Sequence, residues 1–456
     1  MLFNTQAFVL AFLPVVLGLF YAAPSRAGRQ GVLVVASLAF YGYWDVRFVP
    51  ALVALTLANW AVVRWFAWAG DRRILGLGVA LNLAVLGGCK YADFVGEGVA
   101  DLLGLPFTPF GILLPLGVSF FTFQKISYLI DLRRGDRHVY GLLEFFAFVT
   151  FFPQLIAGPL VRHNEIIPQF QADPRGEVAW ENLSRGFALF TIGFAKKVGL
   201  ADTIALVCDP LFARAATTAL SAPEAWLAAG SYSLQIYFDF SGYSDMAIGL
   251  GLMFGLRLPL NFAAPYRATN IREFWRRWHM TLSRFLRDYL YVPLGGNRGG
   301  GFLQARNVVA TMLLGGLWHG AAWSFVVWGG LHGLALAVNG AWARAGWRMP
   351  AWLGWVMTLG FVVAAWVVFR APDAATAINV LGGMAGLQGW GATAVPYRAV
   401  LAVAVAAALI GPTSQDAALS WLRPAPWIAV PVGAALVGLL VLSGERAPNE
   451  FIYFQF

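Results

Sequence analysis

Residues 307–341 read NVVATMLLGGLWHGAAWSFVVWGGLHGLALAVNGA, a stretch without Asp, Glu, Lys or Arg. Glycines interrupt its apolar pattern at Gly315, Gly316, Gly329 and Gly330. Irregular backbone at membrane depth survives only where it is buried in protein or lines a watery cavity. The stretch therefore predicts re-entrant or cavity-lining structure inside a membrane domain. Residues 225–256 invite the same prediction, because they are long for one straight span and carry Asp239 and Asp245.

The composition of the whole chain agrees with a membrane domain. Of 456 residues, 59% are hydrophobic and 12% are charged, whereas soluble domains carry about 25% charged residues. This deficit excludes an ordinary cytosolic enzyme. Apolar runs recur along the chain at the spacing of membrane spans, each of which needs about 20 residues. We expect one all-α polytopic domain over residues 1–456, with about ten to twelve spans.

The distribution of charge predicts an orientation and a partner. Cytoplasmic loops carry the excess of Arg and Lys, and the basic loops here contain Arg26, Arg29, Arg72, Arg73, Arg133, Arg134 and Arg137. The loop at 92–109 has three acids and no basic residue. These loops together predict a multi-pass protein with its N-terminus outside. The net charge of +9, on a chain with 19 Trp and 36 Phe, favours membrane lipids over nucleic acid as the anionic partner.

Residues 257–306 hold nine arginines against Glu273 and Asp288, which is most of the net positive charge. Within this segment, residues 270–291 predict an amphipathic interfacial helix on the cytoplasmic surface, with aromatic and arginine faces. Pro293 and a glycine-rich run then predict a loop. This basic surface can attract the phosphates of an acyl thioester donor, or equally anionic lipid. The residues that we assign to donor binding are Arg276, Arg277, Asn297 and Arg298.

Metal chemistry has little support in the sequence. Cys89 and Cys208 lie far apart, and the CxxC, HxxxH and HExxH spacings are absent. No Asp or Glu occurs from residue 289 to 372. We therefore expect no metal site and no bound cofactor. The nucleophile motif GxSxG is also missing.

Histidines are the remaining candidates for catalysis. His319 and His332 lie in the uncharged stretch, where an ionisable side chain is by default a functional candidate. A neutral imidazole there suits a general base that takes a proton from a hydroxyl, although a histidine bonded to a backbone carbonyl is the simpler interpretation. His279 lies in the predicted amphipathic helix, on the boundary between its apolar and arginine faces. The other polar groups in apolar runs are interpreted as structural ion pairs or span-end anchors: Lys125, Lys196, Lys197, Asp239 and Asp245.

Several motifs in order along the chain resemble the alginate O-acetyltransferase branch of the membrane-bound O-acyltransferase family. They are FYGYWDVRF (40–48), GPLVR (158–162), DFSGYSDMAIG (239–249), FWRRWHMTLS (274–283), DYLYVPLGGNR (288–298), LWHG (317–320) and FIYFQF (451–456). These motifs are spread along nearly the whole chain, from residue 40 to residue 456.

The resemblance implies about eleven transmembrane helices with re-entrant and interfacial helices around a central tunnel. It divides the chain into N-terminal spans (1–140), a catalytic core (141–345) and C-terminal spans (346–456). His319 corresponds to the histidine that faces the tunnel, and His279 to a second polar position that helps to bind or orient the donor. His332, Asp245 and Trp318 are supporting candidates.

The resemblance also implies acetyl transfer from acetyl-CoA or another cytoplasmic acyl thioester toward an exported polysaccharide. A periplasmic partner protein would complete the transfer, and the protein would lie in a bacterial inner membrane. Two alternatives remain: D-alanyl transfer to teichoic acid, and a membrane transporter, which would equally explain spans, broken helices and buried Asp. Inverted repeats, which a transporter would favour, are not evident.

Overall fold

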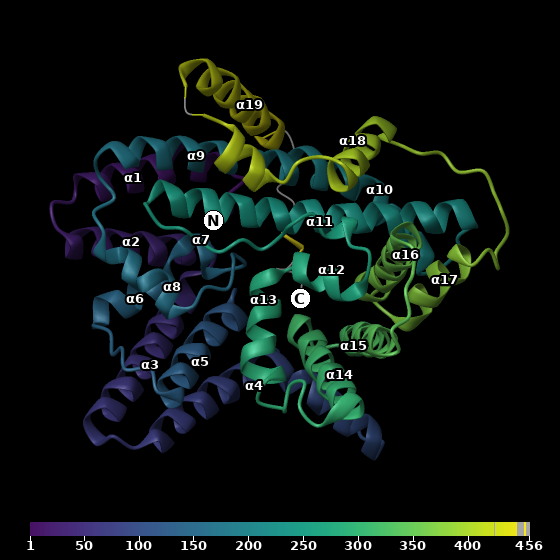
Figure 1. Ribbon diagram of the computed structural model, residues 1–456, viewed down its shortest axis with the longest axis horizontal. Coiled ribbons are helices and arrows are strands. Elements are labelled where there is room, and N and C mark those ends of the chain that lie inside the picture. Colours follow the sequence, from purple (N-terminus) through teal and green to yellow (C-terminus); the bar gives the residue numbers. More distant parts are fainter. Residues whose placement is uncertain (424, 445–450, 453–456) are drawn as a thin grey trace. The chain divides into compact units, whose positions relative to one another are not determined.

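The computed structural model describes residues 1–423, 425–444 and 451–452. Over these residues the chain forms helices joined by turns and loops, without a β-strand (Figure 1). It divides into two compact units. Unit 1 contains residues 1–191, 243–259 and the described residues from 418 to 444, and unit 2 contains residues 192–242, 260–417 and 451–452.

Unit 1 is built mainly from the first half of the chain. Its elements are η1 (Ala7–Phe12), α1 (Leu13–Ala22), α2 (Arg26–Gly42), η2 (Val46–Phe48), α3 (Val49–Ala69), α4 (Arg72–Leu103), α5 (Val118–Arg134), α6 (Leu142–Thr150), α7 (Phe152–Leu155), α8 (His163–Ile166), η3 (Ile167–Gln171) and α19 (Pro426–Gly444).

Unit 2 holds most of the second half. Its elements are η4 (Ala195–Ala201), α10 (Asp202–Ala215), η5 (Pro265–Arg267), α12 (Ile271–Arg277), α13 (Met280–Leu286), η6 (Arg287–Tyr291), α14 (Gly300–His319), α15 (Trp323–Arg344), α16 (Ala351–Arg370), α17 (Ala374–Met384) and α18 (Arg398–Leu409). Three elements contribute residues to both units: α9 (Glu177–Phe194), α11 (Ala222–Met253) and η7 (Asp416–Trp421).

Local capping chemistry sets many of the helix boundaries. The Asp71 carboxylate accepts a hydrogen bond from the Arg73 N–H at the start of α4, and Asn270 accepts one from the Glu273 N–H at the start of α12. Such side-chain caps satisfy amide groups that a helix leaves open at its N-terminus. Gly70 and Gly104 end α3 and α4 in the left-handed conformation, which glycine adopts without a steric penalty.

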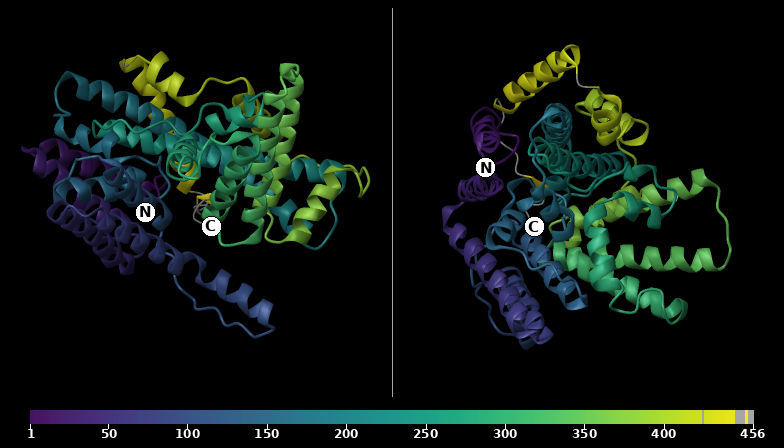
Figure 2. Two further views of the ribbon diagram at one scale, coloured as in Figure 1. Left: turned by 60° about the horizontal axis from the view of Figure 1, so that its bottom comes forward. Right: turned by 60° about the vertical axis from the view of Figure 1, so that its left-hand side comes forward.

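Five helices in the described part of the chain are long and apolar enough to cross a membrane: Val46–Ala69, Arg72–Leu103, Trp323–Arg344, Ala351–Arg370 and Trp427–Gly444. Three shorter apolar helices are Ala7–Ala22, Ala374–Met384 and Arg398–Leu409. Beyond α4, residues 104–117 run back along the end of that helix (Figure 2, left), where the Phe110 N–H donates to Asp93 Oδ1 at 2.7 Å.

Three segments differ from the expectation drawn from the sequence. Residues 222–253 form one continuous helix, α11, instead of a re-entrant segment. The uncharged stretch breaks at residues 320–322, between α14 and α15, and not at its paired glycines. The segment 270–291 is not one helix, because α12 and α13 are separated by Trp278 and His279 and π-helical turns follow at Arg287–Tyr291.

The glycines of α11 serve its packing against α9 and do not interrupt the helix. A methyl group added at Gly249 would lie 2.5 Å from the carbonyl oxygen of Gly186, and one at Gly242 would lie 2.7 Å from that of Gly193. Glycine at these positions lets α9 and α11 approach backbone to backbone, as small residues do in membrane helix pairs.

Candidate active site

The helices α14 and α15 form the framework of the candidate site, and they lie side by side in Figures 1 and 2. A methyl group added at Gly316 would overlap the carbonyl oxygen of Phe325 and lie 3.1 Å from Cα of Gly329. One added at Gly329 would likewise overlap the carbonyl oxygen of Met312. The glycines therefore serve close helix packing, and the turn at residues 320–322 folds α15 back onto α14.

This hairpin brings His319 and His332 to the same aromatic side chain. The ring of Trp328 lies 5.2 Å from that of His319 and 4.8 Å from that of His332, measured between centroids. On a single straight helix, residues thirteen positions apart would be about 20 Å apart. Trp366 and Phe369 of α16 also pack on Trp328, at 5.6 and 5.1 Å.

A hydrogen bond from α12 fixes the tautomer of His332. Trp275 Nε1–H donates to His332 Nδ1 at 3.2 Å. Because the indole nitrogen can only donate, Nδ1 must be the unprotonated nitrogen, and the neutral ring carries its proton on Nε2. His332 is fully buried, and its Nε2 has no hydrogen-bond partner among the described residues. It therefore presents a buried N–H donor.

His279 has the opposite tautomer. Its Nδ1 lies 3.0 Å from Asn261 Oδ1, which also accepts hydrogen bonds from the Thr281 hydroxyl at 3.0 Å and from the Thr281 N–H. The backbone N–H of Thr281 can only donate, so the Asn261 side-chain atom that it contacts must be the oxygen. His279 Nδ1 contacts the same oxygen and must therefore also donate. The neutral ring then keeps the lone pair on Nε2. Such a nitrogen can accept a proton or a hydrogen bond.

The backbone at His279 explains how its ring is placed. His279 has φ 42°, in the left-handed region that non-glycine residues seldom occupy. The Met280 N–H donates to the Asn261 carbonyl, and the Ala263 N–H donates to that of Arg277, both at 3.0 Å. These bonds hold the break between α12 and α13, so the imidazole projects from a bend instead of a helix face.

Trp318 joins the two parts of this histidine cluster, which we define as His279, His319 and His332. Its ring lies 4.9 Å from that of His319 and 6.2 Å from that of His279. Of the three histidines, His279 and His332 are fully buried and His319 is 5% exposed. The cluster therefore lies in a largely dry, aromatic environment, where polar interactions are stronger than in water.

A buried ion-pair network near residue 239 agrees with the structural role expected for these charges. Lys197 Nζ lies 2.6 Å from Asp239 Oδ1 and 2.8 Å from Asp202 Oδ1. The other oxygen of Asp239 accepts a hydrogen bond from the Ile452 N–H at 3.0 Å. Of the FIYFQF motif, residues 451 and 452 are thus tied to the core of unit 2, and residues 453–456 lie outside the described residues.

The candidate donor-binding residues lie in different environments. Arg276 is exposed and lines a cavity beside α12, whereas Arg277 forms an ion pair with Glu273 at 2.7 Å. Asn297 accepts hydrogen bonds from Tyr291 and Gln304 in an exposed turn, and Arg298 is exposed. Asp245, a supporting candidate, is buried in unit 1 and is not part of the histidine cluster as defined above.

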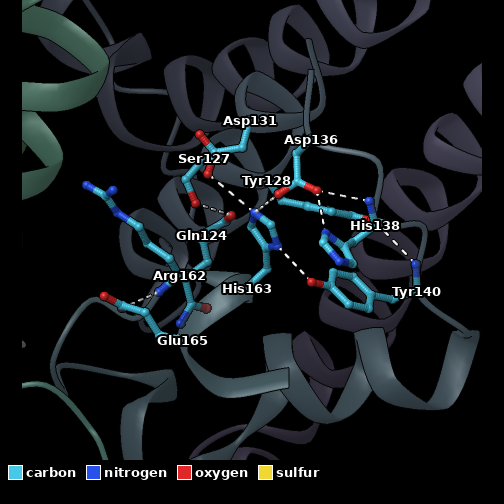
Figure 3. A network of polar contacts seen from close by, with 10 residues as sticks. All are labelled: Gln124, Ser127, Tyr128, Asp131, Asp136, His138, Tyr140, Arg162, His163 and Glu165. Carbon is cyan, nitrogen blue, oxygen red and sulfur yellow. Dashed lines mark hydrogen bonds and ion pairs between the residues drawn. The ribbon is translucent and has the colours of Figure 1, made fainter. Parts of the chain in front are cut away.

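Sequence reasoning missed a polar cluster around His163 in unit 1 (Figure 3). His163 is fully buried; its Nδ1 lies 3.1 Å from the Tyr140 hydroxyl, and its Nε2 lies 3.3 Å from Asp131 and 3.7 Å from Asp136. His138 contacts the other oxygen of Asp136 at 2.7 Å. The feature of the sequence that could have pointed to this cluster is the position of His163 directly after the GPLVR motif.

No group of three or more His, Cys, Asp or Glu side chains in the described part of the chain is arranged to hold a metal ion. The chemical groups of the histidine cluster are therefore imidazole nitrogens within aromatic walls. They are suited to moving a proton or orienting a polar substrate.

Comparison with known proteins decides the family. Residues 115–377, more than half of the chain, match the membrane-bound O-acyltransferase family. The chain belongs to this family. As a membrane-bound O-acyltransferase it is a multi-pass membrane enzyme that transfers acyl groups, which decides against the transporter alternative. The all-α membrane fold predicted from the sequence is confirmed.

Individual relatives match half or more of the chain. A peptidoglycan O-acetyltransferase of Helicobacter pylori is 42% identical over 85% of this chain and 80% of its own length. A probable alginate O-acetylase of Pseudomonas aeruginosa is 44% identical over 86% of this chain and 76% of its own length. A teichoic acid D-alanyltransferase of Streptococcus thermophilus is 30% identical over 50% of this chain and 57% of its own length.

Proposed function

We propose that this membrane-bound O-acyltransferase lies in a bacterial inner membrane and transfers acetyl groups toward an exported polysaccharide, either alginate-like or of another kind. The relatives named for O-acetyl transfer support acetyl as the acyl group, because they match this chain more closely and over more of its length than the D-alanyltransferase does. The donor is a cytoplasmic acyl thioester, either acetyl-CoA or a carrier-bound acetyl group. The N-terminus lies outside.

The observation that carries the chemical proposal is the dry histidine cluster. A thioester already has a good leaving group, so the protein must mainly position a hydroxyl and remove its proton. His319 acts as the general base: the hydroxyl oxygen bonds to the thioester carbonyl carbon while its proton moves to the imidazole. The C–S bond then breaks, and the proton goes to the departing thiolate. General base catalysis of this kind contributes about 10²–10⁴-fold to rate.

The other two histidines of the cluster support this step through their opposite tautomers. His279 Nε2, as an acceptor, binds an N–H group of the donor arm and orients it. His332 Nε2–H, as a buried donor, stabilises a polar group of the reacting partners. The aromatic walls exclude free water, which would otherwise compete with the hydroxyl as nucleophile. The accepting hydroxyl belongs to the polysaccharide or to a periplasmic partner protein that completes the transfer.

The test is the amount of ester-linked acetyl on the exported polysaccharide in cells that carry wild type, His319→Ala or His138→Ala. His138 is an exposed loop histidine and serves as the matched control. We expect loss of acetyl only in His319→Ala, at equal membrane levels of all three proteins. Wild-type acetylation by His319→Ala would remove His319 as the base. D-alanyl esters in place of acetyl in wild-type cells would reassign the acyl group.

A further inference from the structure

A cavity of about 850 Å³ lies in unit 2 between α12, α15 and α16. Its size is in the range of small-molecule binding sites. Polar and apolar side chains both line the cavity, among them Arg272, Arg276, Trp342, Trp347, Met357 and Phe361. The cavity is separate from the histidine cluster, although Phe361 contacts the ring of His332 at 5.2 Å.

Positive charge at this cavity lacks a counter-ion among the described residues. Arg272 and Arg276 are exposed and, within the described residues, neither has an ion-pair or hydrogen-bond partner. The nearby acid, Glu273, is already engaged by Arg277 and by the Thr269 N–H and hydroxyl. The two arginines are one helical turn apart and line the same cavity, so an anion can contact both.

A third arginine increases this positive potential. A methyl group added at Gly340 would lie 3.4 Å from Arg344 Nη1 and 3.8 Å from Arg272 Nη2, so the two guanidinium groups converge on one backbone position. Arg344 Nη1 donates to Gln304 Oε1 at 2.7 Å, a neutral partner. Like charges held this close repel each other, and an anion beside them relieves that repulsion.

Apolar side chains from two candidate spans also line the cavity. Trp342 and Trp347 pack edge to face at 4.9 Å near the end of α15, and Trp347 is 63% exposed. Met357 of α16 is 56% exposed. Tryptophan is enriched where membrane spans end at the headgroup region. If α15 and α16 cross the membrane, as their length and apolar composition allow, the tryptophans of the cavity lie at headgroup level and its apolar side chains lie along the spans.

We propose that this cavity binds an anionic phospholipid. Its phosphate contacts Arg272 and Arg276, its headgroup packs against the tryptophan pair, and its acyl chains follow the exposed faces of α15 and α16. A bound phosphate also holds α12 in place, and α12 carries the Trp275 that sets the tautomer of His332. The lipid thus connects the composition of the membrane with the geometry of the histidine cluster.

The first test is native mass spectrometry of the purified full chain with phosphatidylglycerol or phosphatidylcholine. Wild type is compared with Arg272→Gln/Arg276→Gln and with Arg398→Gln, an exposed arginine at the start of α18 that neither lines the cavity nor adjoins a lining residue in the sequence. Each arginine near a membrane surface strengthens attraction to anionic lipid about fivefold, so the double variant should bind phosphatidylglycerol about thirtyfold more weakly. The Arg398→Gln variant should bind as wild type does. Equal binding by wild type and the double variant, or no preference for phosphatidylglycerol, overturns the proposal.

A second arm separates lipid from the nucleotide part of a thioester donor, which has the same phosphate chemistry. Free coenzyme A is added to the protein loaded with phosphatidylglycerol. Retention of the lipid supports the lipid site. If coenzyme A displaces the lipid from wild type but not from the double variant, the cavity is assigned to the donor and the lipid proposal is overturned. These readouts measure binding without acyl transfer, so they remain valid if the proposed acetyl transfer is wrong.

Discussion

His279 and His332 carry their ring protons on opposite nitrogens. Asn261 Oδ1 accepts the Nδ1 proton of His279, whereas Trp275 Nε1–H occupies Nδ1 of His332. Two buried imidazoles of one chemical type therefore offer one acceptor and one donor. Each role depends on a residue outside the cluster, and each can be removed without changing the histidine itself.

Asn261→Ala removes the acceptor that orients His279. The ring can then rotate or change tautomer, and we expect the acyl-transfer kcat to fall about 10- to 100-fold, because small misplacements of reacting groups have effects of this size. Initial rates in membranes at equal protein level provide the measurement. Thr281→Val is the control, since it removes a different donor to the same Asn261 oxygen and should retain activity. Equal losses in both variants would indicate a general packing defect.

Trp275→Phe removes the N–H that bonds to His332. Leaving Nδ1 of this buried ring without a donor should lower the free energy of unfolding by about 1–3 kcal/mol. It should also shift the His332 proton between ring nitrogens, which ¹⁵N NMR of the five histidines can detect. Trp328→Phe is the comparison, because Trp328 also packs on His332 but its Nε1 has no partner among the described residues. An unchanged His332 spectrum in Trp275→Phe would refute the tautomer assignment.

Gly316→Ala places a methyl group against the backbone of Phe325, where neither α14 nor α15 can yield by moving a side chain. We expect the free energy of unfolding to fall by about 1–3 kcal/mol, as overpacking of a core does. Thermal unfolding of the purified protein, followed by light scattering, checks this. Gly360→Ala in α16 has open space for the added methyl group and should unfold like wild type. Similar losses in both would mean that general helix properties, not the contact, decide stability.

Acid should weaken the His163 cluster through Asp136. Burial acts to raise the pKa of Asp136, but hydrogen bonds from the backbone and ring of His138 and the nearby His163 lower it below its ordinary value. A carboxyl group of this kind contributes stability above its unfolded-state pKa of about 3.9, and the contribution disappears as pH falls through the lower folded-state pKa. The melting temperature of Asp136→Asn should therefore be lower than that of wild type at pH 7, and the difference should shrink below about pH 4.

Asp101→Asn provides the control for this pH dependence, because Asp101 is exposed and lies outside the cluster. Its melting temperature should follow that of wild type across the same range. A difference in melting temperature between wild type and Asp136→Asn that stays constant from pH 7 to 3 would contradict the ionic role of Asp136.

The class of fold could be predicted from the sequence because apolar runs of span length are a one-dimensional property. His319 and His332 could be singled out as candidates because ionisable residues stand out in an uncharged stretch, whereas His279 became a candidate through the FWRRWHMTLS motif. The catalytic roles of all three remain predictions. Their proximity could not be predicted. It depends on the turn after His319, which folds α15 back so that Trp328 and, one helical turn further on, His332 approach His319. On one straight helix the rings of His319 and His332 would lie far apart.

Two further features depended on distant contacts. The periodicity of residues 270–291 predicted one helix, but Asn261 binds the backbone and ring at the break and holds His279 in a left-handed conformation. His163 was missed because its partners Asp131, Asp136 and Tyr140 precede it by more than twenty residues, so no local spacing indicates the cluster.

The contact between Gly316 and Gly329 limits how the enzyme can move. Where two helices touch through their main chains, no flexible side chains lie between them that could adjust to a shift. We therefore expect α14 and α15 to move as one rigid unit. His319 and His332, which these two helices carry, should then keep their separation during turnover. We expect any motion that admits a hydroxyl or releases a thiol on the other sides of the cluster, where the contacts run through side chains such as Trp275 and Trp366.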